Sequence, residues 1–225
     1  MLTVLSITSS TIVRDIEHLS GAGSAYLAYY FFDFKDTRKQ DTRGFLSSIL
    51  VQLSRQSVSF CKILHELLSE HQHGSKQPSD SALKQCLEKV LKVSRNFPLY
   101  VIVDALDECP DTSGLQSPRE KLLALIQELV GLDLPNFRLC VTSRPEIDIR
   151  NGLEPLTTIS SRVSLHDEDG QKDDIADYIR FTIYSDKTMR WREEDKEQVV
   201  EALSNRAHGM YEALLWSKPI FLNFK

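Results

Sequence analysis

The chain has 225 residues, of which 41% are hydrophobic and 26% are charged, and its formal net charge is −5. This length supplies one sizeable core, or one domain with a small appendage. The negative charge and the lack of a basic stripe interleaved with aromatic residues argue against nucleic acid as a main partner. No apolar run approaches the roughly 18 residues of a membrane span.

The first third of the sequence predicts a helix, a strand and two further helices. Residues 3–19 carry apolar side chains at roughly helical spacing, and a turn rich in Gly and Ser follows at 20–24. The run from Tyr26 to Phe34 (YLAYYFFDF) is aromatic and almost continuously apolar, which is typical of a strand within an α/β sheet. Helical stripes of apolar residues then recur at 45–53 and 61–68.

The strongest predicted strand lies near the middle of the chain. A helix over 83–91, which Ser79 or Asp80 can cap, leads into the apolar run from Leu99 to Val103. Three of the five residues in this run are β-branched. Such a run predicts a strand that is buried on both faces, as in a parallel sheet covered by helices.

Three carboxylates follow this strand, at Asp104, Asp107 and Glu108. Open α/β sheets bind ligands at the carboxyl ends of their strands, so we expect these acids at a functional edge. Asp104 suits Mg²⁺ held through water, and Asp107 or Glu108 suits the orientation of an attacking water. The alternative is a polar strand end whose acids cap the next turn.

The sequence Ser117-Pro118-Arg119-Glu120 predicts the start of a helix. Ser caps, Pro occupies the first turn, and Glu stands three residues after the cap, as in a capping box. Gly131 can end this helix.

A third strand is predicted from Phe137 to Thr142, and Arg144 stands just past its end. If this strand is the parallel neighbour of the acidic one, Arg144 lies beside Asp104 at the same edge of the sheet. A guanidinium placed there could bind a γ-phosphate through two hydrogen bonds. The alternative is a surface arginine that pairs with a local acid such as Glu146 or Asp148.

The last third of the sequence predicts a weaker strand at 162–165 and two helices, at about 171–184 and 193–208. A loose tail follows at 216–225. Strands that alternate with helices predict an α/β fold, a parallel sheet in three layers.

The four cysteines have neither CxxC spacing nor a zinc pattern with nearby histidines. We therefore interpret them as small reduced thiols and expect a cytoplasmic protein. They are Cys61, Cys86, Cys109 and Cys140.

Several of these segments resemble NACHT domains, which are P-loop nucleoside triphosphatases of the STAND class. The segment 103–109 (VDALDEC) resembles their Walker B segment, and 139–146 (LCVTSRPE) resembles their sensor-1 strand. The strand at 26–34 resembles the strand that follows the first helix of those domains. From Ser9 to about Met210 the sequence is most similar to the NACHT domains of fungal NLR-like receptors, which are often catalogued as nephrocystin-3-like N-terminal modules.

This resemblance implies a signal-transducing ATPase or GTPase that switches between nucleotide states and oligomerises. In fungi such receptors are associated with self/non-self recognition, including heterokaryon incompatibility. Carried over to this sequence, Asp104 is the Mg²⁺ acid, Asp107 and Glu108 are the acids around the catalytic water, and Arg144 is the sensor-1 arginine. Mg²⁺ with ATP or GTP are the implied cofactors.

The phosphate-binding motif G-x-x-x-x-G-K-[ST] does not occur in the 225 residues, and in the family it directly precedes the helix predicted at 3–19. We therefore expect an incomplete P-loop-type sheet that lacks the first strand and the phosphate loop. The expected domain spans 1–210, with a divergent tail at 211–225. Because the loop supplies most of the binding to phosphates, we expect the chain alone neither to bind nor to hydrolyse nucleotide.

Two alternatives stay open at this point. In the first, the chain is a non-catalytic interaction or regulatory module that pairs with a full-length NLR-like receptor. In the second, it is an active ATPase or GTPase whose P-loop is missing from the gene model. In each case we expect the chain to associate with itself or with full-length NACHT proteins. We expect it to bind neither nucleic acid nor membranes.

Overall fold

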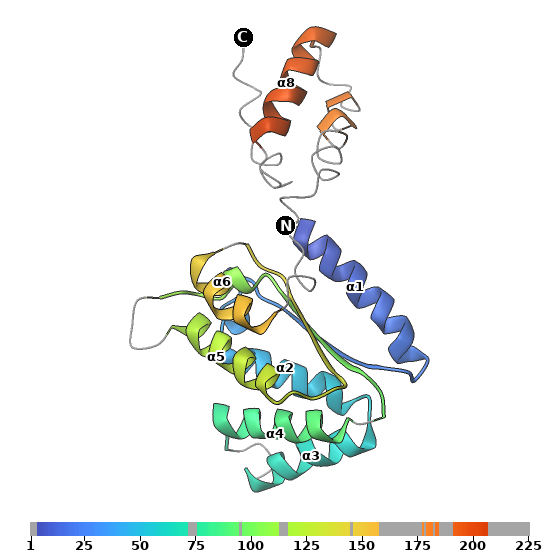
Figure 1. The fold of residues 1–225 in the computed structure, drawn as a ribbon, viewed down its shortest axis with the longest axis vertical. Helices are drawn as coiled ribbons and strands as arrows, with labels where there is room; N and C mark the ends of the chain where they lie inside the picture. The colour runs from blue at the N-terminus through green and yellow to red at the C-terminus, as the bar shows by residue number, and fades with distance from the viewer. Residues whose placement is uncertain are drawn as a thin grey trace. The chain divides into compact units, whose positions relative to one another are not determined.

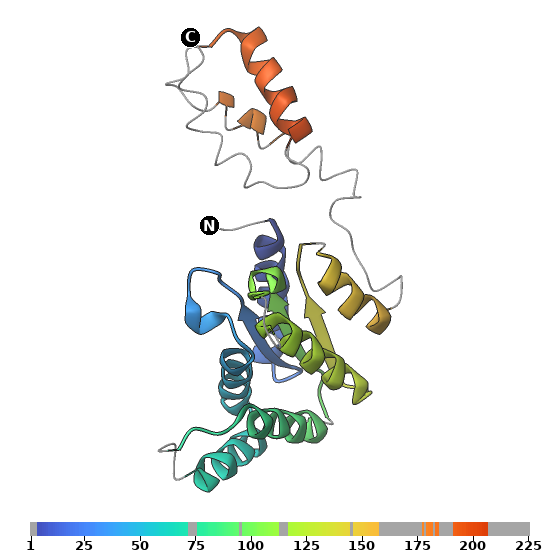
Figure 2. The same cartoon turned by 90° about the vertical axis from the view of Figure 1, so that its left-hand side faces the viewer.

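The structure is a computed structural model, and it describes residues 4–71, 76–94, 96–112, 117–144, 146–157, 177, 179–181, 183–184 and 191–206. The chain divides into two compact units. One unit comprises Leu5–Thr158 and holds the sheet, and the other comprises Met1–Val4 with Ile159–Lys225 (Figure 1, Figure 2).

The sheet of the larger unit has three parallel strands in the order β1-β2-β3. They are β1 (Tyr26–Phe31), β2 (Leu99–Asp104) and β3 (Phe137–Val141). The prediction of an α/β fold with a parallel sheet is confirmed. In this order β2 is the middle strand, which explains why its apolar run is continuous.

Helices cover both faces of the sheet (Figure 1). On one face Val13 of α1 packs against Leu27 and Ile102. On the other face Val101 and Val103 belong to the main core, together with buried side chains of α2, α4 and α5. The helices of the larger unit are α1 (Val4–Gly21), α2 (Thr42–Ser54), α3 (Val58–Glu70), α4 (Asp80–Val93), α5 (Pro118–Gly131) and α6 (Ile147–Leu153).

The structure departs from the predicted bounds at the end of β1. The strand ends at Phe31 instead of Phe34, because the chain turns where the Asp36 N–H donates to the carbonyl of Asp33 (3.1 Å). The short helix η1 (Thr37–Lys39) follows this turn. The turn brings the backbone N–H of Phe34 to the Glu108 carboxylate, four residues past the end of β2.

The second unit is described only in part. Its described residues are helical at 177, 179–181 and 183–184 and in α8 (Glu193–Arg206). Ile183 and Val200 are buried there, and Arg180 pairs with Glu197 (3.1 Å). The strand predicted at 162–165 and the tail at 211–225 lie outside the described residues. In the described part of the chain we find no helix with the length and apolarity that a membrane crossing requires.

Candidate functional site

The carboxyl ends of β2 and β3 meet at one edge of the sheet, and the chain turns sharply there. Ala105 has a positive φ of 54°, a left-handed conformation that is uncommon for residues other than glycine. The turn continues into η3 (Leu106–Glu108), and the N–H of Leu106 donates to the carbonyl of Thr142 (3.0 Å). Because Leu106 is fully buried, η3 is anchored between the core and β3.

Asp104 lies beneath this turn and is enclosed by two hydroxyl groups. Its Oδ1 accepts hydrogen bonds from Ser9 Oγ (2.5 Å) and from Thr142 Oγ1 (2.6 Å). Only 2% of Asp104 is exposed, and Ser9 is fully buried. The carboxylate therefore joins α1, β2 and β3 in the interior.

This geometry tests whether Asp104 can hold Mg²⁺. Mg²⁺ takes oxygen ligands at near-octahedral positions and usually keeps several waters. The carboxylate and hydroxyl oxygens are of the right chemical kind, but Asp104 is closed to solvent by Ser9 and Thr142. Among the residues that the structure describes, no group of three or more His, Cys, Asp or Glu could hold a metal ion. In this arrangement the site does not fit the ion.

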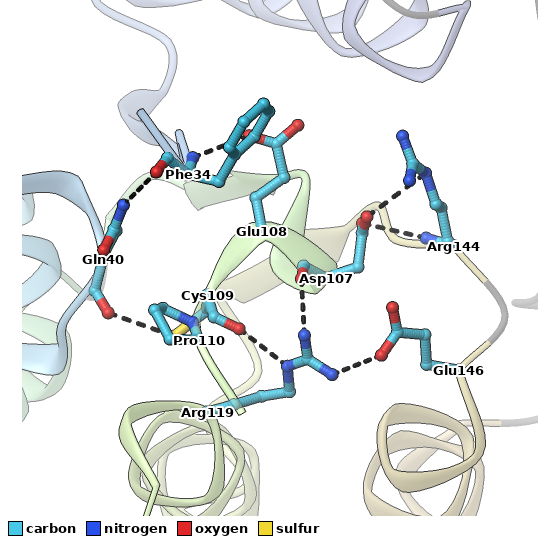
Figure 3. Close-up of a pocket in the computed structure, with 9 residues that line it drawn as sticks. All are labelled: Phe34, Gln40, Asp107, Glu108, Cys109, Pro110, Arg119, Arg144 and Glu146. Atoms are coloured by element: carbon cyan, nitrogen blue, oxygen red, sulfur yellow. Dashed lines mark hydrogen bonds and ion pairs between the residues drawn. The ribbon is translucent and has the colours of Figure 1, made fainter. Parts of the chain in front are cut away.

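A pocket of about 370 Å³ lies between η3, the loop after β1 and the segment that follows β3. Three of the four predicted site residues line it: Asp107, Glu108 and Arg144 (Figure 3). Asp104 does not. The remaining lining residues are Phe34, Gln40, Cys109, Pro110, Arg119 and Glu146.

Arg144 binds Asp107. Its backbone N–H donates to Asp107 Oδ1 (3.0 Å), and its Nε lies 3.5 Å from Oδ2. The predicted adjacency of the two strands is correct, but Thr142 is the residue that reaches Asp104. The reason is η3, which folds Asp107 back over the end of β3. The Arg144 side chain is 47% exposed and that of Asp107 only 6%.

Glu108 stands at the opposite side of the same turn. Its Oε2 accepts a hydrogen bond from the backbone N–H of Phe34 (3.1 Å). Burial raises the pKa of Glu108, and the negative charges of Asp107 and Asp33 raise it further, whereas the Phe34 N–H and Arg144 lower it. The net shift is upward, which makes this carboxylate a stronger base toward a water molecule.

Arg119, which is not among the predicted site residues, supports the turn from below. Its Nε donates to the carbonyl of Cys109 (2.9 Å), and its Nη2 donates to the carbonyl of Asp107 (2.6 Å). Its Nη1 binds the carboxylates of Glu146 (2.5 Å) and Asp148 (3.2 Å). Glu146 and Asp148 are the two acids that the sequence offers as local partners for Arg144.

One signal in the sequence indicates such a role. An arginine in the first turn of a helix meets the positive end of the helix dipole, where acidic residues are favoured. Arg119 is also 6% exposed, so it requires specific partners to offset the burial of its charge.

Cys109 closes the other wall of the pocket. Its side chain is fully buried, its Sγ donates to the carbonyl of Gln40 (3.4 Å), and burial raises its pKa to about 12. The Gln40 amide in turn donates to the carbonyl of Phe34 (2.6 Å). Cys109 is therefore a neutral structural thiol that ties η3 to the loop after β1.

With the geometry in place, comparison with known proteins gives one family. Residues 5–144 match the family model described as "Nephrocystin 3, N-terminal". This stretch contains all three strands and the four predicted site residues. No curated protein matches the chain.

Among solved structures, one similar chain comes from the "Structure of Drosophila ORC bound to AT-rich DNA and Cdc6". The identity is 13%, covering 89% of this chain and 79% of that chain, with a TM-score of 0.24. A similarity this low supports no conclusion about function.

Proposed function

Because the chain belongs to the nephrocystin 3 N-terminal family, we propose that it is a NACHT-type nucleotide-binding signalling module that retains the Walker B and sensor-1 residues. The observation that carries this proposal is the pocket in which Asp107, Glu108 and Arg144 lie together. In this proposal Glu108 stands where a base would accept a proton from water, and Arg144 stands where a guanidinium would bind a phosphate, once a phosphate-binding loop is present. Asp107 orients Arg144 through the two contacts described above.

We propose further that the 225 residues do not turn over nucleotide by themselves. Two observations support this view: the sequence has no G-x-x-x-x-G-K-[ST] motif, and Asp104 is enclosed by Ser9 and Thr142. Each charged hydrogen bond missing from a phosphate site costs about 1.5–3 kcal/mol. The loss of several weakens a micromolar site to beyond about 1 mM.

The purified full chain tests the proposal. ATP and GTP binding is measured by calorimetry, and turnover is measured as phosphate release with and without Mg²⁺. We expect no turnover above the rate of a Glu108→Gln variant. Robust Mg²⁺-dependent hydrolysis that Glu108→Gln abolishes would contradict the proposal that the 225 residues do not turn over nucleotide by themselves.

A second candidate is a non-catalytic interaction module that pairs with a full-length NLR-like relative in the cytoplasm. The enclosed Asp104 favours this candidate, because a buried hydrogen-bonded carboxylate serves the fold instead of a ligand. In the fungal setting of the resemblance, such pairing would regulate self/non-self recognition. Co-purification with a full-length relative tests the pairing, and failure to associate at micromolar concentrations would exclude it.

The third candidate, an active ATPase or GTPase with its P-loop upstream, is tested by the genomic sequence before the Met1 codon. An in-frame G-x-x-x-x-G-K-[ST] there supports it, and a stop codon directly upstream counts against it.

A further inference from the structure

The outer edge of β1 has no neighbouring strand within the part of the chain that the structure describes. In the parallel ladder, alternate residues of β1 direct their backbone groups toward β2. The N–H groups of Tyr26 and Phe32, for example, donate to the carbonyls of Pro98 and Asp104. The intervening residues Leu27 and Tyr29 therefore direct their N–H and C=O groups outward.

Two glutamines satisfy these outward groups: Gln52 lies in α2, and Gln56 lies in the turn directly after it. Gln56 accepts a hydrogen bond from the Leu27 N–H (2.9 Å) and donates to the Leu27 carbonyl (2.5 Å). Gln52 makes the same pair of bonds with Tyr29, at 3.0 Å and 2.8 Å. Each side-chain amide thus takes the place that a peptide group of a neighbouring strand would occupy.

The match follows from the geometry of helices and strands. Residues four apart on a helix lie about 6 Å apart along its axis, and Arg55, which links α2 to Gln56, keeps a right-handed helical conformation (φ −76°, ψ −16°). Residues two apart on a strand lie about 6.6 Å apart. Gln52 and Gln56 therefore meet Leu27 and Tyr29 in register.

Further hydrogen bonds hold both amides in place. Ser48 Oγ accepts from Gln52 Nε2 (3.0 Å), and Ser20 Oγ donates to Gln56 Oε1 (3.2 Å). Gln56 Nε2 also donates to the carbonyl of Gln52 (3.0 Å). The two amides are therefore fixed from α1 and from α2 itself.

Packing alone does not cover this edge. A pocket of about 290 Å³ lies against it, lined by Leu27, Tyr29 and both glutamines together with Glu17, Ser20 and Arg55. If the glutamine amides were absent, the outward backbone groups would face this pocket. Unpaired strand edges of this kind are templates for pairing with another chain.

The segment that would pair most readily is β1 itself. Its sequence, YLAYYF, has no charge, no proline and no glycine, and four of its six residues are aromatic. Short segments with these properties and high β-propensity associate edge to edge.

We propose that Gln52 and Gln56 close the β1 edge against pairing with β1 of a second copy of this chain. The inference does not depend on the proposed nucleotide-related function. Any self-association of the folded chain then uses other surfaces.

The first test is a double variant of the full chain, Gln52→Met with Gln56→Met. Methionine has nearly the same length as glutamine but no amide. We expect light scattering to detect self-association at a concentration about tenfold lower than for the parent chain. A tenfold change in concentration corresponds to the net free energy of about one hydrogen bond. Gln85→Met, an exposed glutamine of α4, serves as the matched control and is expected to behave as the parent.

The second test assigns each glutamine to its own backbone group by amide hydrogen exchange on dilute, folded single variants. Gln52→Met is expected to accelerate exchange of the Tyr29 amide about tenfold, with little change at Leu27. Gln56→Met is expected to accelerate exchange of the Leu27 amide about tenfold, with little change at Tyr29. Unchanged exchange at both amides would overturn the proposal. So would self-association of the double variant that is no stronger than that of Gln85→Met.

Discussion

The Arg119 guanidinium binds three segments at once: the turn η3, the residue after it, and the start of α6. It donates to the backbone carbonyls of Asp107 and Cys109 and to the carboxylates of Glu146 and Asp148. The backbone of the residues that line the pocket therefore depends on a side chain that does not belong to the predicted Walker B or sensor-1 motifs.

We expect Arg119→Met to lower the free energy of unfolding by about 2–3 kcal/mol, because it leaves two carbonyls and two carboxylates without their donor. Urea denaturation measures the loss. Arg150→Met is the control, because Arg150 forms an exposed pair with Glu154, and such pairs contribute about 0.5 kcal/mol or less. Equal losses in both variants would contradict the role of Arg119.

The raised pKa of Glu108 predicts a pH-dependent effect on stability. Folding disfavours the ionised carboxylate, so this group lowers stability at pH values above its folded pKa. The penalty disappears as the pH falls below the ordinary glutamate pKa of 4.5, where the group is protonated in both states.

Glu108→Gln is therefore expected to melt at a higher temperature than the parent at neutral pH, and the difference should shrink as the pH falls toward 4.5. Thermal melts over this range measure it, with Glu66→Gln on the exposed face of α3 as control. A difference that stays constant with pH would show that the carboxylate charge is not its cause.

Helix α5 positions Arg119, and its first turn is held by a capping box. Ser117 Oγ accepts from the Glu120 N–H (3.0 Å), and the Glu120 carboxylate accepts from the Ser117 N–H (3.1 Å). The predicted helix start is confirmed at this position. The cap thus fixes the helix end from which the guanidinium reaches η3.

Ser117→Ala is expected to cost about 1 kcal/mol of unfolding free energy. Because Ser117 is 2% exposed, water cannot replace the lost hydroxyl. Chemical denaturation measures the change, and Ser81→Ala, in the exposed first turn of α4, is expected to cost less than about 0.5 kcal/mol. A loss at Ser117 no larger than at Ser81 would contradict the capping role.

The two hydrophobic clusters that pack on the faces of the sheet consist of residues between Ile12 and Leu156. The larger unit, Leu5–Thr158, therefore contains its own core. We expect a chain of residues 5–158 to unfold in a single cooperative transition. Calorimetry checks this, and a broad, non-cooperative melt would show that the core needs residues outside this unit.

The sequence by itself determined the three strands, the helices α1 to α5 and the parallel sheet of the larger unit, but neither the end of β1 nor α6. The apolar run of β2, the stripes of α2 and α4 and the cap of α5 are local patterns, and local patterns reflect the backbone geometry of their own segment. Strands that follow one another along the chain are often neighbours in the sheet, and the order β1-β2-β3 agrees with this tendency. The adjacency of the acidic strand and the strand before Arg144, which the sequence offered as a condition, is present in the structure.

Only the tertiary structure decided which partner each polar side chain meets. The left-handed turn at Ala105 moves Asp107 onto Arg144 and leaves Asp104 to Ser9 and Thr142. Arg119 and the Gln52–Gln56 pair likewise act on residues distant in sequence. Spacing along the chain carries no information on such contacts, because they depend on how packed elements bring single atoms within hydrogen-bond distance.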